Sequence, residues 1–99
     1  MEISTASDEK TTTISLSGHL NTTTAPELEQ AIQALDPTPS DLVIDVAGID
    51  YLSSAGLRVL LAAKKHLDAC GGTFSVINAT DDVQEVFDIT GLTEVLEVR

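Results

Sequence analysis

The sequence predicts a mixed α/β domain with a four- to five-stranded sheet and three main helices, in the order β-β-α-β-α-β-α-β. Short alternating segments rich in β-branched residues predict the strands. Between the later strands lie segments whose apolar residues recur at helical spacing. Strands joined through helices pair in parallel by right-handed crossovers, so only the opening hairpin adds an antiparallel edge. With 99 residues, the chain suffices for a single domain, residues 1–99.

The elements follow from these patterns in chain order. The expected strands are residues 3–7, 11–17, 42–46, 73–77 and 95–98. The expected helices run from Thr24 to before Pro37, from Ser53 or Ser54 to about Cys70, and from about Thr80 to about Leu92.

Local signals set the ends of the helices. Thr24 is the expected N-cap of the first helix, and Glu27, three residues later, completes a capping box. Gly71-Gly72 ends the second helix, and Thr80 or Asp81 can cap the third.

Composition and charge exclude several classes of function. The net charge is −11, and phosphate backbones and anionic lipid headgroups repel a strongly anionic surface. We therefore expect no direct nucleic-acid partner and no membrane insertion, and no apolar run approaches the roughly 20 residues that span a bilayer. Residues 1–10 lack the features of a signal peptide, and Cys70 is the only cysteine, which indicates a reducing, cytoplasmic location.

The second helix divides into two faces when its residues are placed on a helical wheel. Ser54, Arg58, Lys65 and Asp68 fall on one polar face that also includes Leu61, with Leu57 at its edge. The opposite, core-facing side is expected to hold Val59, Leu60, Ala63, Leu67 and Cys70. An apolar residue surrounded by basic and polar side chains is typical of a small protein interface, although a scattered surface leucine is the alternative.

Three segments in register resemble one known family. Residues 50–57, Asp-Tyr-Leu-Ser-Ser-Ala-Gly-Leu, resemble the signature of the STAS family, which comprises the anti-sigma factor antagonists and the cytosolic domains of sulphate transporters. Residues 16–21 resemble its strand-to-helix turn, and residues 87–92 its C-terminal motif. The resemblance covers essentially the whole chain and implies a STAS-like fold.

The family resemblance implies a role in partner switching. In that scheme the unmodified protein binds an anti-sigma factor that is also a serine kinase, which frees the sigma factor. The kinase uses Mg-ATP to phosphorylate the antagonist, which then dissociates, and a serine phosphatase resets it. By position in the motif, the phosphoacceptor corresponds to Ser54. The domain itself would need no cofactor, no metal and no catalytic residue.

Two positions depart from the commonest family pattern. Ser53 stands where Asp often precedes the acceptor, and Asn21 stands where the turn usually carries Asp. Ser53 is also a second hydroxyl beside the acceptor, so the acceptor could be displaced by one residue. We expect the partner-binding residues to be Asn21, Ser53, Ser54, Ala55, Leu57, Arg58, Leu61 and Lys65.

Three alternatives remain beside the switch. Ser54 can be a simple helix N-cap. The domain can be a non-switching STAS subunit of a transporter or of a larger regulatory assembly. An enzyme built on Ser54 is disfavoured, because the Gly-x-Ser-x-Gly elbow of serine hydrolases is absent. Asp45 either faces the rim near Ser54 or faces solvent from the strand.

Overall fold

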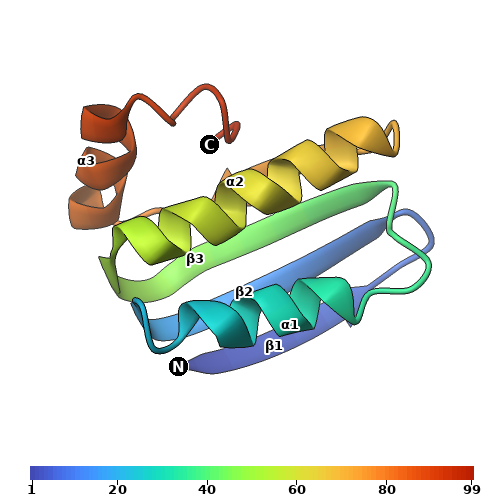
Figure 1. Cartoon of the computed structure of the whole chain (residues 1–99), viewed down its shortest axis with the longest axis horizontal. Helices are drawn as coiled ribbons and strands as arrows, with labels where there is room; N and C mark the ends of the chain where they lie inside the picture. Colours follow the sequence, from blue (N-terminus) through green and yellow to red (C-terminus); the bar gives the residue numbers. More distant parts are fainter.

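Four strands form one mixed sheet in the computed structural model, which describes residues 1–99 (Figure 1). The strands, in both chain and spatial order, are β1 (Glu2–Ser7), β2 (Thr11–Leu20), β3 (Asp41–Leu52) and β4 (Thr73–Ile77). β1 pairs antiparallel with β2, whereas β2 with β3 and β3 with β4 pair in parallel. The predicted hairpin followed by parallel crossovers is confirmed.

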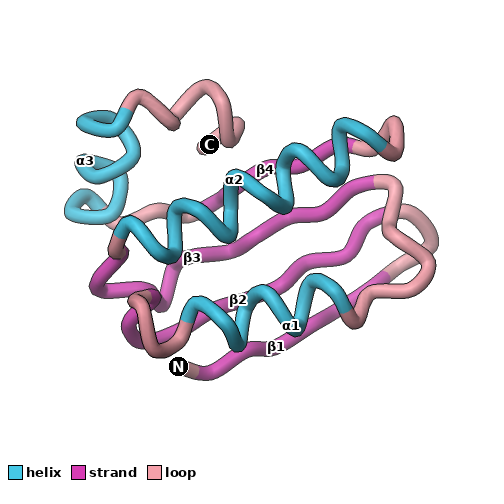
Figure 2. Tube along the Cα trace, in the orientation of Figure 1, coloured by secondary structure: helices cyan, strands magenta, loops and turns pink.

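Two helices cover one face of this sheet, and the third lies at its end. The helices are α1 (Ala25–Gln33), α2 (Ser54–Ala69) and α3 (Asp81–Thr90). α1 and α2 run side by side across the sheet, and α3 lies near the start of α2 (Figure 2). None of the three combines the length and apolar character that crossing a membrane requires.

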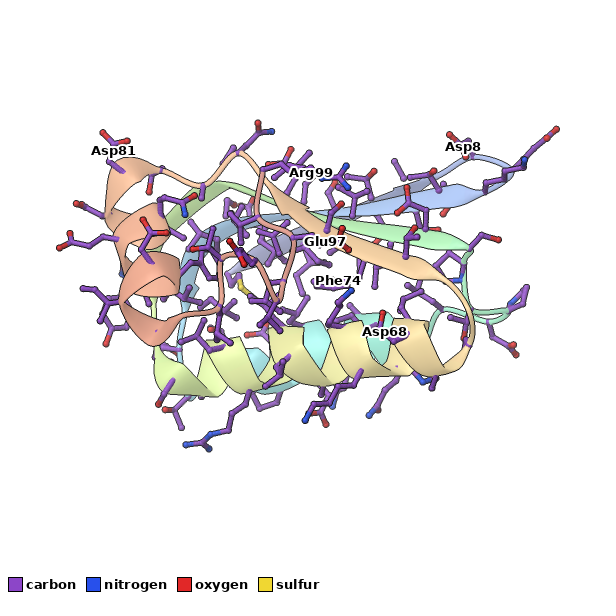
Figure 3. The ribbon with its side chains drawn as sticks, turned by 90° about the horizontal axis from the view of Figure 1, so that it is seen from above. Asp8, Asp68, Phe74, Asp81, Glu97 and Arg99 are labelled. Atoms are coloured by element: carbon purple, nitrogen blue, oxygen red, sulfur yellow. The ribbon has the colours of Figure 1, made fainter.

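The core fills the layer between the sheet and the helices. In β3 the side chains of Leu42, Ile44 and Val46 are almost completely buried, and every second residue between them is partly exposed. This period of two is that of a strand with one covered face. Phe74, which is fully buried, lies in the same layer, between α2 and the sheet (Figure 3). The core is thus mainly aliphatic, with Phe74 and Phe87 as its buried aromatic residues.

β3, with 12 residues, is more than twice as long as the expected strand 42–46, and a bulge explains the difference. Its pairing register with β2 shifts between Ser15 and Ser17, opposite Gly48. A Cβ atom at Gly48 would lie 2.6 Å from the Cβ atom of Ser17, so only glycine allows the two backbones this approach. After the bulge the buried residues are Ile49 and Leu52, which breaks the alternation that marks a strand in the sequence.

The predicted last strand is reduced to a single bridge between Val76 and Val98. The segment before it forms turns instead, with Leu96 N–H donating to the carbonyl of Leu92 at 2.9 Å. Leu96 is nevertheless fully buried in the core. Lys64 of α2 contacts Glu97 at 3.3 Å, so this C-terminal segment is held against both the sheet and a helix.

The three helices begin in different ways. The Thr80 hydroxyl accepts a hydrogen bond from Val83 N–H at 3.4 Å, which confirms it as the N-cap of α3. The capping box predicted at Thr24 is wrong, because that hydroxyl donates to the carbonyl of His19 and accepts from Asn21 N–H. Ser53 is the N-cap residue of α2, with extended backbone, but its side chain makes no capping hydrogen bond.

The core placement predicted for Cys70 is also wrong. Cys70 is exposed and lies just beyond Ala69, the last residue of α2. The helix ends there because Gly71 adopts a φ of +77°, a left-handed conformation that glycine tolerates. The wheel that placed Cys70 in the core assumed that the helix continues to this position.

Replacement of Leu96 tests whether the C-terminal segment belongs to the core. We expect Leu96→Ala to lower the free energy of unfolding by about 2–5 kcal/mol, because it leaves a cavity at a fully buried position. The matched control Val95→Ala alters a side chain that is 45% exposed, and it should change that free energy by less than about 0.5 kcal/mol. Urea denaturation measures both, and equal losses would contradict the observed packing.

A second pair of variants compares the two helix N-caps. Thr80→Ala removes a capping hydrogen bond and should lower the free energy of unfolding by about 1 kcal/mol. Ser53→Ala removes a buried hydroxyl that has no partner, so it should be neutral or stabilising. A cost for Ser53→Ala as large as that for Thr80→Ala, measured by the same denaturation, would mean that the Ser53 hydroxyl caps α2 in solution.

Candidate functional site

Two turns meet where β2 and β3 end. The two strands are parallel and Leu20 pairs with Leu52, so β2 and β3 end on the same side of the sheet (Figure 1). Ser53 N–H donates to the carbonyl of Leu20 at 2.9 Å, which joins the two exits directly. The turn into α1 and the start of α2 therefore lie side by side.

Asn21 shapes the first of these turns. Its side-chain oxygen accepts hydrogen bonds from the N–H groups of Thr23 and Thr24, at 3.0 and 3.1 Å. This is the usual way in which Asn and Asp stabilise a turn through their own side chains. An aspartate could accept the same two bonds, so Asn21 keeps the turn while it leaves out the negative charge.

The two adjacent serines have opposite environments. Ser54 is the first residue of α2 and is exposed. Ser53 is half-buried, and its Oγ atom is inaccessible to solvent and has no hydrogen-bond partner. Ala55, which follows, is half-buried against the core. Of the two hydroxyls, only that of Ser54 is on an exposed residue.

The start of α2 lacks negative charge. Its first turn contains no acidic residue, whereas α1 has Glu27 and α3 has Asp81 and Asp82 in the corresponding turn. The first backbone N–H groups of a helix have no partner within the helix, and they favour an anion. Arg58 is exposed one turn after Ser54 and makes no salt bridge. The first turn of α2 therefore combines free backbone N–H groups with an exposed arginine, on a chain whose net charge is −11.

The outward face of α2 continues from this start. Arg58 and Lys65 are exposed, and Leu61 between them is half-buried, with part of its side chain packed on the core. Leu57 does not belong to this face, contrary to the wheel, because it is only 8% exposed. Two turns further along α2, Lys64 contacts Glu97 of the C-terminal segment.

A cluster that the sequence did not reveal borders the site. Nδ1 of His19 contacts the carboxylate of Asp50, and the rings of His19 and Tyr51 lie perpendicular at a centroid distance of 6.0 Å. Tyr51 is 53% exposed. The pairing of His19 with Tyr51 in the sheet brings them together. The cluster forms only because β2 and β3 continue past the bulge at Gly48, which the sequence pattern did not indicate.

Asp45 lies away from this site. It alternates with the buried Ile44 and Val46, and its carboxylate accepts hydrogen bonds from Asn78 and from Ala47 N–H. The solvent-facing alternative is the one observed. No group of three His, Cys, Asp or Glu side chains is arranged to hold a metal ion.

Comparisons with known proteins agree on one family. The family model described as "Mlab, STAS domain" matches residues 3–97. The anti-sigma factor antagonist BtrV of Bordetella bronchiseptica is 36% identical over 84 residues, which are 84% of this chain and 72% of that protein.

Solved structures agree with this match. An anti-sigma factor antagonist from Mycobacterium paratuberculosis superposes with a TM-score of 0.87 at 30% identity, over 98% of this chain and 83% of that one. The unphosphorylated form of the antagonist SpoIIAA superposes with a TM-score of 0.85 over 99% of this chain and 88% of that one, and at 18% identity it shows the fold alone. The sheet with helices on one face, the paired turns at its edge and the match over residues 3–97 together establish that the chain belongs to the STAS domain family.

Proposed function

We propose that the protein is an anti-sigma factor antagonist whose binding is switched by phosphorylation of Ser54. In its unphosphorylated form it binds an anti-sigma factor that is a serine kinase, and so frees the sigma factor. The observation that carries the proposal is the exposure of Ser54 at the start of α2, beside the exposed Arg58 and next to the buried hydroxyl of Ser53. The proposal is supported by two relatives, BtrV and the Mycobacterium paratuberculosis protein, whose names describe them as anti-sigma factor antagonists.

The choice of Ser54 over Ser53 rests on access. A kinase must align the acceptor oxygen with the transferred phosphoryl group, so the hydroxyl has to be reachable from solvent. The Oγ atom of Ser53 is inaccessible to solvent, and the backbone N–H of the same residue donates a hydrogen bond to the carbonyl of Leu20. Ser54 meets the requirement without any change in the fold.

A phosphate on Ser54 would leave the fold of the domain intact and would weaken the binding of a partner. The free N–H groups of the first turn of α2 and the absence of an acidic residue there favour an anion at this position. The modification adds a charge of about −2, together with three oxygens. Release of the partner then follows from local repulsion and bulk. SpoIIAA, which shares the fold, has been solved in a phosphorylated form.

The docking face comprises the Ser54 turn and the outward side of α2. Arg58 and Lys65 are exposed cations on either side of the half-buried Leu61. An apolar contact with a charged rim is the usual composition of a small interface. Asn21 contributes by fixing the neighbouring turn through its bonds to Thr23 and Thr24.

The domain acts in this scheme by binding alone. Mg-ATP and the catalytic groups belong to the kinase, and a serine phosphatase restores the unmodified serine, so the antagonist needs no catalytic residue. The exchange takes place in the cytoplasm, where the sigma factor meets its polymerase. A permanently bound STAS subunit of a transporter or larger assembly is the competing function, and the phosphorylation test separates the two.

Phosphorylation by the kinase that binds this protein is the direct test. Incubation with that anti-sigma factor and Mg-ATP should add one phosphate, located on Ser54 by mass spectrometry. Ser54→Ala should abolish incorporation, whereas the control Ser53→Ala should retain it, because the Ser53 hydroxyl is buried. A protein that takes no phosphate but co-purifies stoichiometrically with a transporter would favour the subunit instead.

Substitution at the docking face tests the placement of the interface. Leu61→Glu puts a charge at the centre of the face and should weaken binding of the anti-sigma factor at least about tenfold, as expected for a central interface residue. The control Ile89→Glu alters a side chain that is 76% exposed on α3 and should leave the affinity unchanged. Titration calorimetry measures both, with circular dichroism to verify the fold. Normal binding by Leu61→Glu would place the partner elsewhere.

A further inference from the structure

A groove between α1 and α2 lies outside the site described above. Its cavity volume is about 630 Å³, within the range that small-molecule sites occupy. The apolar lining consists of Ile32 and Leu35 from α1 and the residues after it, and of Val59, Ala62 and Ala63 from α2. The two alanines leave the space open, since larger side chains there would fill it.

The groove lies between the second half of α1 and the middle of α2. Its lining continues to Thr38 beyond α1 and to His66 in α2, whereas Ser54 starts α2 at the opposite end (Figure 1). An occupant of this groove would therefore not contact Ser54.

The charged side chains that line the groove are acidic. Glu29 and Asp36 are exposed and make no hydrogen bond or salt bridge through their side chains. No lysine or arginine lines the groove, and Nε2 of His66 lies 3.3 Å from the hydroxyl of Thr38. Two unpaired carboxylates beside an apolar floor complement a molecule that has an apolar body and a positive charge.

We propose that this groove binds a small amphipathic cation, an aliphatic amine whose chain lies against Ile32, Leu35 and Val59 and whose ammonium group pairs with Glu29 or Asp36. The carboxylates select the charge, and the space above Ala62 and Ala63 admits the chain. This site is independent of the partner-binding role of Ser54.

Hexylamine, hexanol and hexanoate provide a test with one chain length and three charges. Each is titrated into the ¹⁵N-labelled full chain, and the amide shifts are followed by NMR. Hexylamine should bind most tightly and hexanoate least, with shifts confined to residues 29–38 and 59–66. Shifts outside this region, absence of shifts, or hexanoate binding as tightly as hexylamine would overturn the proposal.

Variants separate the shape of the groove from its charge. Ala62→Leu fills the space and should lower the affinity for hexylamine at least tenfold, while Ala69→Leu, at an exposed alanine of α2 outside the groove, should not. The double variant Glu29→Gln/Asp36→Asn should lower the affinity for hexylamine by about fivefold and leave that for hexanol unchanged.

The control Glu27→Gln/Asp82→Asn changes the net charge equally but lies outside the groove, and it should have no effect. Retention of hexylamine affinity by the Glu29 and Asp36 variant, or an equal loss in this control, would contradict selection by the groove carboxylates. The charge variants test the proposal even if Ala62→Leu fails to fold.

Discussion

The parallel pairing of β2 with β3 is the constraint on which the site depends. Two neighbouring parallel strands end on the same side of the sheet, so the segments that follow them lie close together although they are distant in the sequence. Here the bond from Ser53 N–H to the Leu20 carbonyl fixes that meeting point. The turn shaped by Asn21 and the first turn of α2 become a single surface for this reason.

Within that surface, burial distinguishes two residues of the same chemistry. Ser53 adopts the extended backbone of an N-cap and turns its hydroxyl into the protein, where it finds no partner. Ser54 takes the first helical position and is exposed. The arrangement costs the free energy of an unsatisfied polar group, and it leaves one accessible hydroxyl among free helix amides.

Much of the fold could be predicted from the sequence because its signals are local. The β-branched alternation of residues 11–17 and the Thr80 cap depend on neighbours in the chain, and both appear as expected. The signals that failed depend on distant segments. The extension of β3 past Gly48 needs Ser17 opposite it, and Leu57 is buried because it packs in the common core with residues from other elements.

The site was predictable to the same degree. A motif could place Ser54 at a helix start, but which of the two adjacent serines is exposed depends on how this turn packs against the rest of the domain. The cluster of His19, Asp50 and Tyr51 and the groove between α1 and α2 arise from elements that meet in space. No pattern within one segment could have indicated them.

The unequal lengths of the strands have a mechanical consequence. β4 pairs with β3 only as far as Asp45, and β1 pairs with β2 only as far as Ser17, which lies opposite Gly48. Beyond Gly48, β2 and β3 therefore form a ribbon of two strands, and such ribbons twist more strongly than wide sheets. α3 packs against β3 through the buried side chains of Val83 and Phe87. α3 therefore supports the strand that leads into the serine turn, and a displacement of α3 would act directly on that strand.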